Sequence, residues 1–249
     1  MRTWFDSIAK MVFLPNFTPL NKIMIKNILR PFSLAAFLLI LLTAGKPKDL
    51  KEVILDDLIN ETQFTLDKDS EDALRIVWWI PTEFWATIYA KDPSIDEDAA
   101  AEIVSSLEKY TMVIVIDGDM TAFGDLKSKS SSKIRKGLKV IDADGKEYSP
   151  MDDEDIDFGA KMVLNMMKPM FSNLLGKMGE SMELMMFQKD EVAILNPFED
   201  AGSINYGGES LDLNLPLSSL MEDKICPTDD EKMNSKWKYC PIHGVKLDK

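Results

Sequence analysis

The chain has 249 residues, of which 45% are hydrophobic and 29% charged, and its formal net charge is −13. This composition is typical of a globular protein, which excludes intrinsic disorder as the default state. The negative charge also excludes nucleic acid as an expected partner, because the phosphates would repel the protein.

The first predicted element is an export signal. Residues 31–45 form an uncharged run with an apolar core over 32–42, and the run ends in small residues of the kind that signal peptidase requires. Three cations precede the run, namely Lys22, Lys26 and Arg30. Because positive charge stays on the cytoplasmic side, the rest of the chain is expected outside the cytoplasm, periplasmic or extracellular.

Residues 1–45 are interpreted as an N-terminal extension and signal peptide, with the start at Met1 or at Met24. The alternative is an uncleaved signal in which residues 31–45 anchor the protein in the membrane. Residues 46–222 are expected to form one α+β domain, and 223–249 a tail that contains both cysteines and the single histidine. A chain of about 200 residues buries a core without the help of disulfides.

Helices and strands are expected to interleave without a regular βαβ order. The expected elements are a helix over 49–60, a strand over 73–80, a helix opened by Pro81, a helix behind the capping box of Ser94 and Glu97, a strand over 111–116, a hairpin closing at 142–145, a helix over 155–178 kinked at Pro169, and strands over 183–187 and 211–215. Asp117-Gly118 predicts a turn from which 120–123 returns as a hairpin partner. The expected class is a single globular α+β domain with antiparallel hairpins and a long methionine-rich helix.

Methionine is concentrated in one part of the chain, since nine of the sixteen lie between Met151 and Met186. Met162, Met166 and Met170 share one face of the helix expected over 155–178. Thioethers bind Cu(I), but they also fill irregular cores and form partner surfaces. Core packing is the expectation, and the copper site and the partner surface stay open as alternatives.

Catalytic motifs are absent from the sequence. With one histidine and no Gly-x-Ser-x-Gly elbow, a Ser-His-Asp hydrolase is excluded. Carboxylate chemistry remains, with Glu83, Asp117 and Asp119 as candidates that nothing in the sequence pairs. The aromatic residues around Pro81 are expected in the core, with stacking on a sugar as the alternative.

The tail repeats one pattern, as Cys226-Pro-Thr-Asp229 and as Cys240-Pro-Ile-His243-Gly244. It resembles the paired knuckles of zinc-ribbon and rubredoxin-type proteins, in which Cys-Pro-x-Cys-Gly occurs twice around one metal. The resemblance covers the tail only and departs from the pattern at two of the four ligand positions. It implies a structural zinc ion with Cys226, Asp229, Cys240 and His243 as ligands, and with Trp237 and Tyr239 packed against the knuckle.

The alternative for the tail is a disulfide between Cys226 and Cys240, which an oxidising compartment favours. It would close a loop of about 15 residues and contribute about 3 kcal/mol. Both interpretations give the tail a structural role.

Two classes of function remain. The first is an exported, envelope-associated binding protein without catalytic activity, whose partner is an envelope protein or polymer. The second is a carboxylate-based enzyme that acts on an envelope polymer. The first is the expectation, with membrane contact only through the signal or the uncleaved anchor, and the whole chain resembles exported bacterial proteins without assigned activity.

Overall fold

The computed structural model describes residues 46–247 except 67–71, 123–125, 176 and 200. The predicted export signal at 31–45 lies outside the described residues. Within the described part, no helix combines the length and the apolar character that a membrane crossing needs. The α+β class with antiparallel sheets is confirmed.

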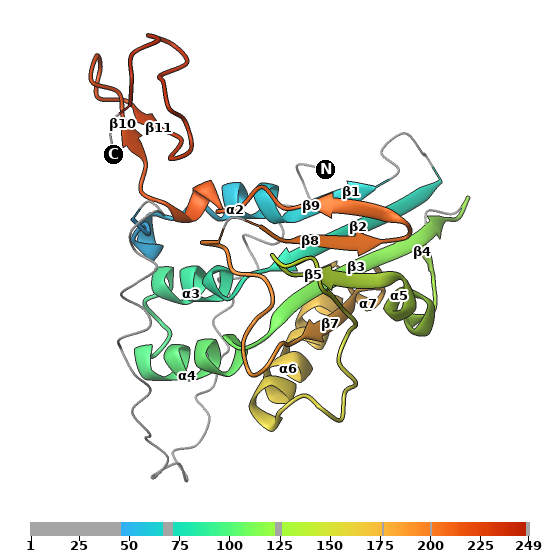
Figure 1. Cartoon of the computed structure of the whole chain (residues 1–249). Coiled ribbons are helices and arrows are strands. Elements are labelled where there is room, and N and C mark those ends of the chain that lie inside the picture. Colours follow the sequence, from blue (N-terminus) through green and yellow to red (C-terminus); the bar gives the residue numbers. More distant parts are fainter. Residues whose placement is uncertain (1–45, 67–71, 123–125, 176, 200, 248–249) are drawn as a thin grey trace.

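A five-stranded antiparallel sheet forms the centre of the fold (Figure 1). Strands β2 (Ala73–Ile80) and β3 (Thr111–Met120) pair from Ala73 opposite Asp119 to Ile80 opposite Met112. Strand β1 (Gln63–Leu66) pairs with β2, while β4 (Leu126–Ser128) and β7 (Glu183–Phe187) pair with successive parts of β3. Their β-branched and aromatic residues suit a sheet that is covered on both faces.

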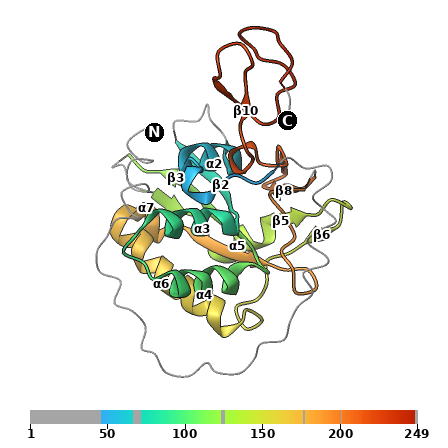
Figure 2. The same cartoon turned by 90° about the vertical axis from the view of Figure 1, so that its left-hand side faces the viewer.

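A second antiparallel sheet has the order β6-β5-β8-β9. Its strands are β5 (Leu138–Ile141), β6 (Glu147–Tyr148), β8 (Ser203–Tyr206) and β9 (Glu209–Asp212). The hairpin predicted around 142–145 is therefore confirmed as the β5–β6 pair. Figure 2 shows α7 at the left of the molecule and β5 with β6 at the right.

Helices surround these sheets. They are η2 (Leu50–Glu52), α2 (Leu55–Thr62), α3 (Thr82–Lys91), α4 (Glu97–Leu107), α5 (Ser131–Gly137), α6 (Phe158–Leu175), α7 (Lys177–Glu180) and η3 (Ser218–Leu220). Helix α3 packs on α4 and η2, and α4 packs on α6. The methionine-rich segment predicted as one helix over 155–178 thus divides into the 18-residue α6 and the short α7.

The core contains both tryptophans of β2. Trp78 and Trp79 point to opposite faces of the strand, yet each is only 1% exposed. Phe84 of α3 meets Trp78 edge-on at 5.3 Å and Trp85 at 5.2 Å between ring centroids. The expectation that this aromatic cluster is core is confirmed for these four residues, while Tyr89 of the same cluster is half-buried.

The turn predicted at Asp117-Gly118 is wrong, because β3 continues through both residues to Met120. A Cβ on Gly118 would lie 2.7 Å from the carbonyl oxygen of Lys127 in the neighbouring strand. Glycine is therefore required here for close approach of two strands and not for a reversal of the chain. The return strand is β4, later in the chain than the predicted 120–123.

Three other boundaries differ from the predictions. The helix predicted over 49–60 is η2 followed by α2. Helix α4 is capped by the side chain of Asp96, which accepts from the N–H of Ala99, and not by Ser94. The strand predicted over 211–215 is β9, which ends at Asp212.

The C-terminal module, which we define as residues 223–247, projects from the rest of the fold (Figure 1). It contains the antiparallel pair β10 (Lys224–Ile225) and β11 (Lys232–Met233). Its buried residues Cys226, Met233, Cys240 and Leu247 form an apolar cluster separate from the main core.

Candidate metal centre

Two short turns of the C-terminal module carry the predicted ligands. In the first, the N–H of Asp230 donates to the carbonyl of Cys226, and the N–H of Cys226 donates to the carbonyl of Glu231, both at 2.9 Å. Asp230 has a φ of 59°, in the left-handed region that Asp tolerates better than most residues. Strands β10 and β11 close this turn, with Ile225 opposite Lys232.

The second turn has the same backbone geometry. The N–H of Gly244 donates to the carbonyl of Cys240 at 2.9 Å, and the N–H of Cys240 donates to the carbonyl of Val245 at 2.8 Å. Gly244 has a φ of 65°, and Tyr239 lies opposite Lys246 in an isolated antiparallel bridge. The sequence repeat of the tail is therefore also a repeat of backbone structure.

The turns bring three ligand side chains together. Nδ1 of His243 lies 3.5 Å from Sγ of Cys226 and 3.6 Å from Sγ of Cys240. The three ligand atoms all lie within 4.8 Å of one another, and the N–H of His243 donates to the sulfur of Cys240 at 3.4 Å. Cys226, Cys240 and His243 form a group that is able to hold a metal ion such as zinc.

The spacing of these atoms fits tetrahedral coordination. Zinc binds thiolate sulfur at about 2.3 Å and imidazole nitrogen at about 2.0–2.1 Å, so a tetrahedral site holds sulfur and nitrogen about 3.6 Å apart. The sulfur–nitrogen distances around His243 are 3.5 and 3.6 Å. Donor type and donor spacing therefore both suit zinc.

Asp229 occupies the position in the first turn that His243 occupies in the second. Its Oδ2 lies 3.6 Å from Nδ1 of His243, and its Oδ1 accepts from the N–H of Glu231 at 3.2 Å. A hydrogen bond from the Cys226 side chain holds the pKa of Asp229 below its usual value. The structure thus places the fourth predicted ligand at the edge of the group of three.

The two thiols differ in their electrostatic surroundings. Burial raises the pKa of the Cys226 thiol. Burial also disfavours the thiolate of Cys240, but the backbone N–H groups of His243 and Ile242 outweigh this effect and hold the pKa of Cys240 below its usual value. The thiolate is the form that binds metal, and these N–H groups favour it at Cys240.

Both cysteines are buried free thiols. A metal ion and a disulfide would use the same two sulfur atoms. The two predicted outcomes for Cys226 and Cys240 therefore exclude each other in any one molecule.

The predicted packing of Trp237 and Tyr239 against the knuckle is wrong, since these side chains are 45% and 59% exposed. Met233 and Leu247 fill the cluster instead. Each of them stands seven positions after a cysteine, at 226 and 240. This equal spacing of apolar residues was the sequence signal for the small core of the module.

Asp117, one of the carboxylates considered for catalysis, is occupied by ion pairs and a hydrogen bond. Asp117 is 1% exposed, and its Oδ2 accepts from Lys129 and from the hydroxyl of Tyr206, both at 2.6 Å. Nε of Arg75 lies 3.4 Å from its Oδ1. Asp117 therefore belongs to an ion network between β3 and β8, and the prediction that it serves a turn is wrong.

Glu83 is in α3 and lies near the end of β3 that is remote from Asp117. Ile80 pairs with Met112, so Glu83 follows the Met112 end of the strand, and this end lies five positions from Asp117 along β3. This is about 17 Å of strand, whereas the two acids of a glycosidase are at most about 9.5 Å apart. Burial raises the pKa of Glu83, and the charge of Glu108, a carboxylate outside the predicted set, raises it further.

The methionine stripe of α6 consists of Met162, Met166 and Met170. Met162 is half-buried and Met166 is 37% exposed. The side chain of Met170 lies outside the described part of the structure. The core expectation is therefore wrong for Met166, and the buried methionine of this part of the helix is its neighbour Met167.

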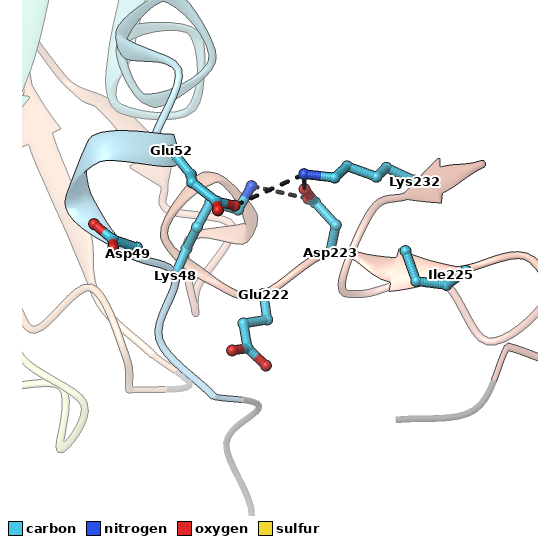
Figure 3. A pocket seen from close by; sticks show the side chains of 7 residues that line it. All are labelled: Lys48, Asp49, Glu52, Glu222, Asp223, Ile225 and Lys232. Atoms are coloured by element: carbon cyan, nitrogen blue, oxygen red, sulfur yellow. Dashed lines mark hydrogen bonds and ion pairs between the residues drawn. The ribbon is translucent and has the colours of Figure 1, made fainter. Parts of the chain in front are cut away.

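An open pocket of about 210 Å³ lies at the root of the module (Figure 3). Lys48 pairs with Asp223 at 2.8 Å across this junction, and Lys232 lies 3.7 Å from Glu52. Backbone hydrogen bonds from Glu222 to Lys46 and from Lys48 to Leu220, both 2.8 Å, run beside these ion pairs. The module is therefore joined to the body mainly through polar contacts.

No protein-family model, curated protein or solved structure matches the chain. The likeness of the tail to zinc-ribbon knuckles therefore depends on the ligand residues and on the geometry of the two turns.

Proposed function

We propose that this protein is an exported binding protein without catalytic activity, whose C-terminal module is held together by one structural zinc ion. The observation that carries the proposal is the convergence of Cys226, Cys240 and His243 from two turns of the same backbone geometry. Asp229, with its Oδ2 3.6 Å from His243, is the fourth ligand in this proposal.

The proposed role of the metal is structural. When bound, zinc cross-links the two turns and supplies folding free energy to the module. Four protein ligands close the coordination shell, whereas catalytic zinc sites keep one position for water or substrate. The backbone N–H groups that approach Cys240 help the chain to hold the sulfur as a thiolate.

Export is supported by the order of charges and apolar residues before position 46. The cations at 22, 26 and 30 precede the apolar core over 32–42, which is the order found in signal peptides. A binding role is favoured over the second candidate, a carboxylate-based enzyme, by the ion pairs that occupy Asp117 and by the separation of Glu83 from it. The proposed partner is an envelope protein or polymer.

Metal content and thiol content together test the proposal. The protein is expressed with its own N-terminus, recovered from the exported fraction, and analysed for bound elements and for thiols after unfolding with a chelator. We expect one zinc per chain and two reactive thiols. Protein without metal and without thiols would contain the disulfide instead, and stoichiometric copper would point to the methionines.

A cysteine variant and a matched control locate the metal. Cys240→Ser removes a ligand and is expected to abolish zinc binding. Lys238→Ala changes an exposed neighbour in the same segment and is expected to retain full zinc content. Equal zinc content in the two variants would place the metal elsewhere. Cell fractionation and the N-terminal sequence of the exported protein test the signal, and cleavage is expected close to Lys46.

A further inference from the structure

Helix α6, which packs beside α4 (Figure 2), is apolar on its outer face as well as on its inner one. The inner residues are buried in the main core, namely Ala160, Val163, Met167 and Phe171. On the other side of the helix, Phe158, Met162 and Met166 stand four positions apart and therefore form one line along it. We call these three residues the outer stripe.

The outer stripe is open to solvent. Phe158 is 80% exposed, Met166 is 37% exposed and Met162 is half-buried. A helix on the surface of a globular protein normally has a polar outer face. The core therefore accounts for the inner face of α6 and leaves the outer stripe without a partner among the described residues.

Negative charge is concentrated at the N-terminal end of the stripe, where residues 152–155 are four consecutive exposed acids. Asp152 lies 3.3 Å from Arg135, whereas the other three carboxylates have no ion-pair partner in the described part of the chain. Lys161 of α6 is half-buried, and its Nζ donates to the backbone carbonyl of Glu154 at 3.2 Å. Four carboxylates against two cations leave this end of the helix negative.

These acids are not needed to begin α6. Asp157 caps the helix, because its Oδ1 accepts from the N–H of Ala160 at 2.8 Å. The first turn of α6 contains no acidic residue, and the helix dipole acts mainly within that turn. The charge of residues 152–155 is therefore available to an external cation.

An apolar line with a negative end fits a partner helix that has an apolar face and positive charge. Such a helix covers a line of apolar anchors with its own residues at i, i+4 and i+7. The outer stripe is eight positions long, which is about 12 Å or two turns of helix. Methionine adapts to apolar partners of different shape, while the carboxylates attract lysine and arginine and repel an anionic bilayer.

We propose that the outer stripe and residues 152–155 form a docking surface for a cationic amphipathic helix of an envelope protein. The apolar face of the partner covers Phe158, Met162 and Met166, and its cations face the acids of 152–155. This inference rests on the proposed binding function and names the class of partner.

The test uses the exported protein with its zinc and a synthetic helix as the probe. The probe is a fluorescent peptide of leucine and lysine, about four turns long, with all leucines on one helical face. A peptide of the same composition in scrambled order has the same charge and no apolar face. Fluorescence anisotropy measures both affinities, and NMR of methyl-labelled methionine shows which methionines respond.

We expect the probe to bind at least about tenfold more tightly than the scrambled peptide, since only the probe covers the stripe. The methyl signals of Met162 and Met166 should shift on binding. The signal of Met233, which is buried in the C-terminal module, should stay in place.

An apolar variant tests the stripe. Phe158→Gln with Met166→Gln keeps two long side chains and removes the apolar anchors, so the affinity for the probe should fall about tenfold or more. The matched control is Ile54→Gln with Val192→Gln, which changes two side chains that are 57% and 55% exposed elsewhere. The control is expected to bind as the wild type does.

A charge variant tests the acidic end. Asp153→Asn, Glu154→Gln and Asp155→Asn together should lower the affinity about tenfold at low salt and less at high salt. The matched control removes three exposed charges from strands, with Asp119→Asn, Glu147→Gln and Glu209→Gln. It should stay within about twofold of the wild type.

Three results would overturn the inference. Equal weakening in a variant and its control would mean that the probe binds the acidic protein without using this surface. No binding by protein that keeps its zinc would remove the docking surface and leave the metal centre and the export standing. A dimer in sedimentation that Phe158→Gln with Met166→Gln converts to a monomer would assign the stripe to a second copy of the chain. Failure of the proposed function itself would appear separately, as protein without zinc or protein that is not exported.

Discussion

Asp229 and Asp230 are adjacent residues with different roles in the candidate metal centre. Asp229 directs Oδ2 to His243 at 3.6 Å, while Asp230 supplies the left-handed backbone position of the turn, with a φ of 59°. Replacing each with Asn preserves size and removes the charge, and Asn also accepts the left-handed conformation. The two variants therefore separate a ligand from a turn residue.

We expect Asp229→Asn to weaken zinc binding by about tenfold to a hundredfold, since loss of a group that ligates or orients a ligand typically costs this much. Asp230→Asn is expected to bind zinc as the wild type does. Competition titration with a chromophoric chelator measures both affinities. Equal affinities would remove Asp229 from the ligand set.

Asp142 is a buried carboxylate at the second hairpin. Its Oδ2 accepts from Nζ of Lys189 at 2.7 Å and from the hydroxyl of Tyr148 at 2.9 Å, and its Oδ1 accepts from the N–H of Lys146. Lys189 first, and the backbone N–H second, hold the pKa of Asp142 far below its usual value. Protons therefore bind the unfolded chain more readily than the folded one.

This shift predicts a loss of stability in acid. A carboxyl whose folded-state pKa is lowered stabilises the fold fully above its unfolded value of about 3.9, and the stabilisation is lost as the pH falls below it. In urea unfolding between pH 7 and pH 3, we expect the free energy of unfolding of Asp142→Asn to fall less steeply than that of the wild type. Parallel curves for the two proteins would contradict the assignment.

At the scale of elements, Asp117 connects the two sheets. It lies in β3 of the central sheet, and Tyr206, which donates to it at 2.6 Å, lies in β8 of the second sheet. Two cations, Lys129 and Arg75, flank the same carboxylate. Removing the carboxylate leaves these charges without their common partner, which is the costly way to break a buried ion pair.

We expect Asp117→Ala to lower the free energy of unfolding by about 2–4 kcal/mol, because the lysine and the arginine keep partial access to water. Asp119→Ala changes an exposed residue two positions along the same strand and is expected to stay within about 0.5 kcal/mol of the wild type. Urea unfolding compares the three proteins. Similar losses in both variants would show that the network does not join the sheets.

Helices and strands were predictable where the local sequence alone determines the secondary structure. The strand at 73–80 is confirmed to the residue as β2, and 183–187 as β7, because runs of β-branched, aromatic and apolar residues end at clear boundaries. Asp117-Gly118 failed because the same dipeptide suits a turn and also a strand that another strand approaches closely. The two cases differ only in the tertiary structure, in which the carbonyl of Lys127 lies close to Gly118.

The meeting of three of the four predicted residues of the candidate site was predictable, and the surroundings of the site were not. Cys226, Cys240 and His243 meet as their spacing indicated. The aromatic residues were misplaced, since sequence shows that Trp237 and Tyr239 are near the knuckle but not on which side of it they lie. Met233, seven positions after Cys226, and Leu247, seven positions after Cys240, are buried in the small core. The aromatic residues are therefore left on the outside.

At the scale of the whole molecule, the residues that the structure describes form two apolar cores of very different size. The main core includes residues from both large sheets, while the module buries only Cys226, Met233, Cys240 and Leu247 with Val245 against them. A cluster this small does not stabilise a fold without a metal or a disulfide. The module should therefore depend on zinc, while the body should not.

Hydrogen exchange with and without a strong chelator tests this dependence. We expect chelation to raise exchange across 224–247, where the turn amides of Cys226 and Cys240 are protected by hydrogen bonds, and to leave β2 and β3 unchanged. We expect the increase in exchange to stop at the junction near Lys48 and Asp223. Unchanged exchange in the module would mean that its turns form without metal, and increased exchange in β2 and β3 would mean that module and body unfold as one unit.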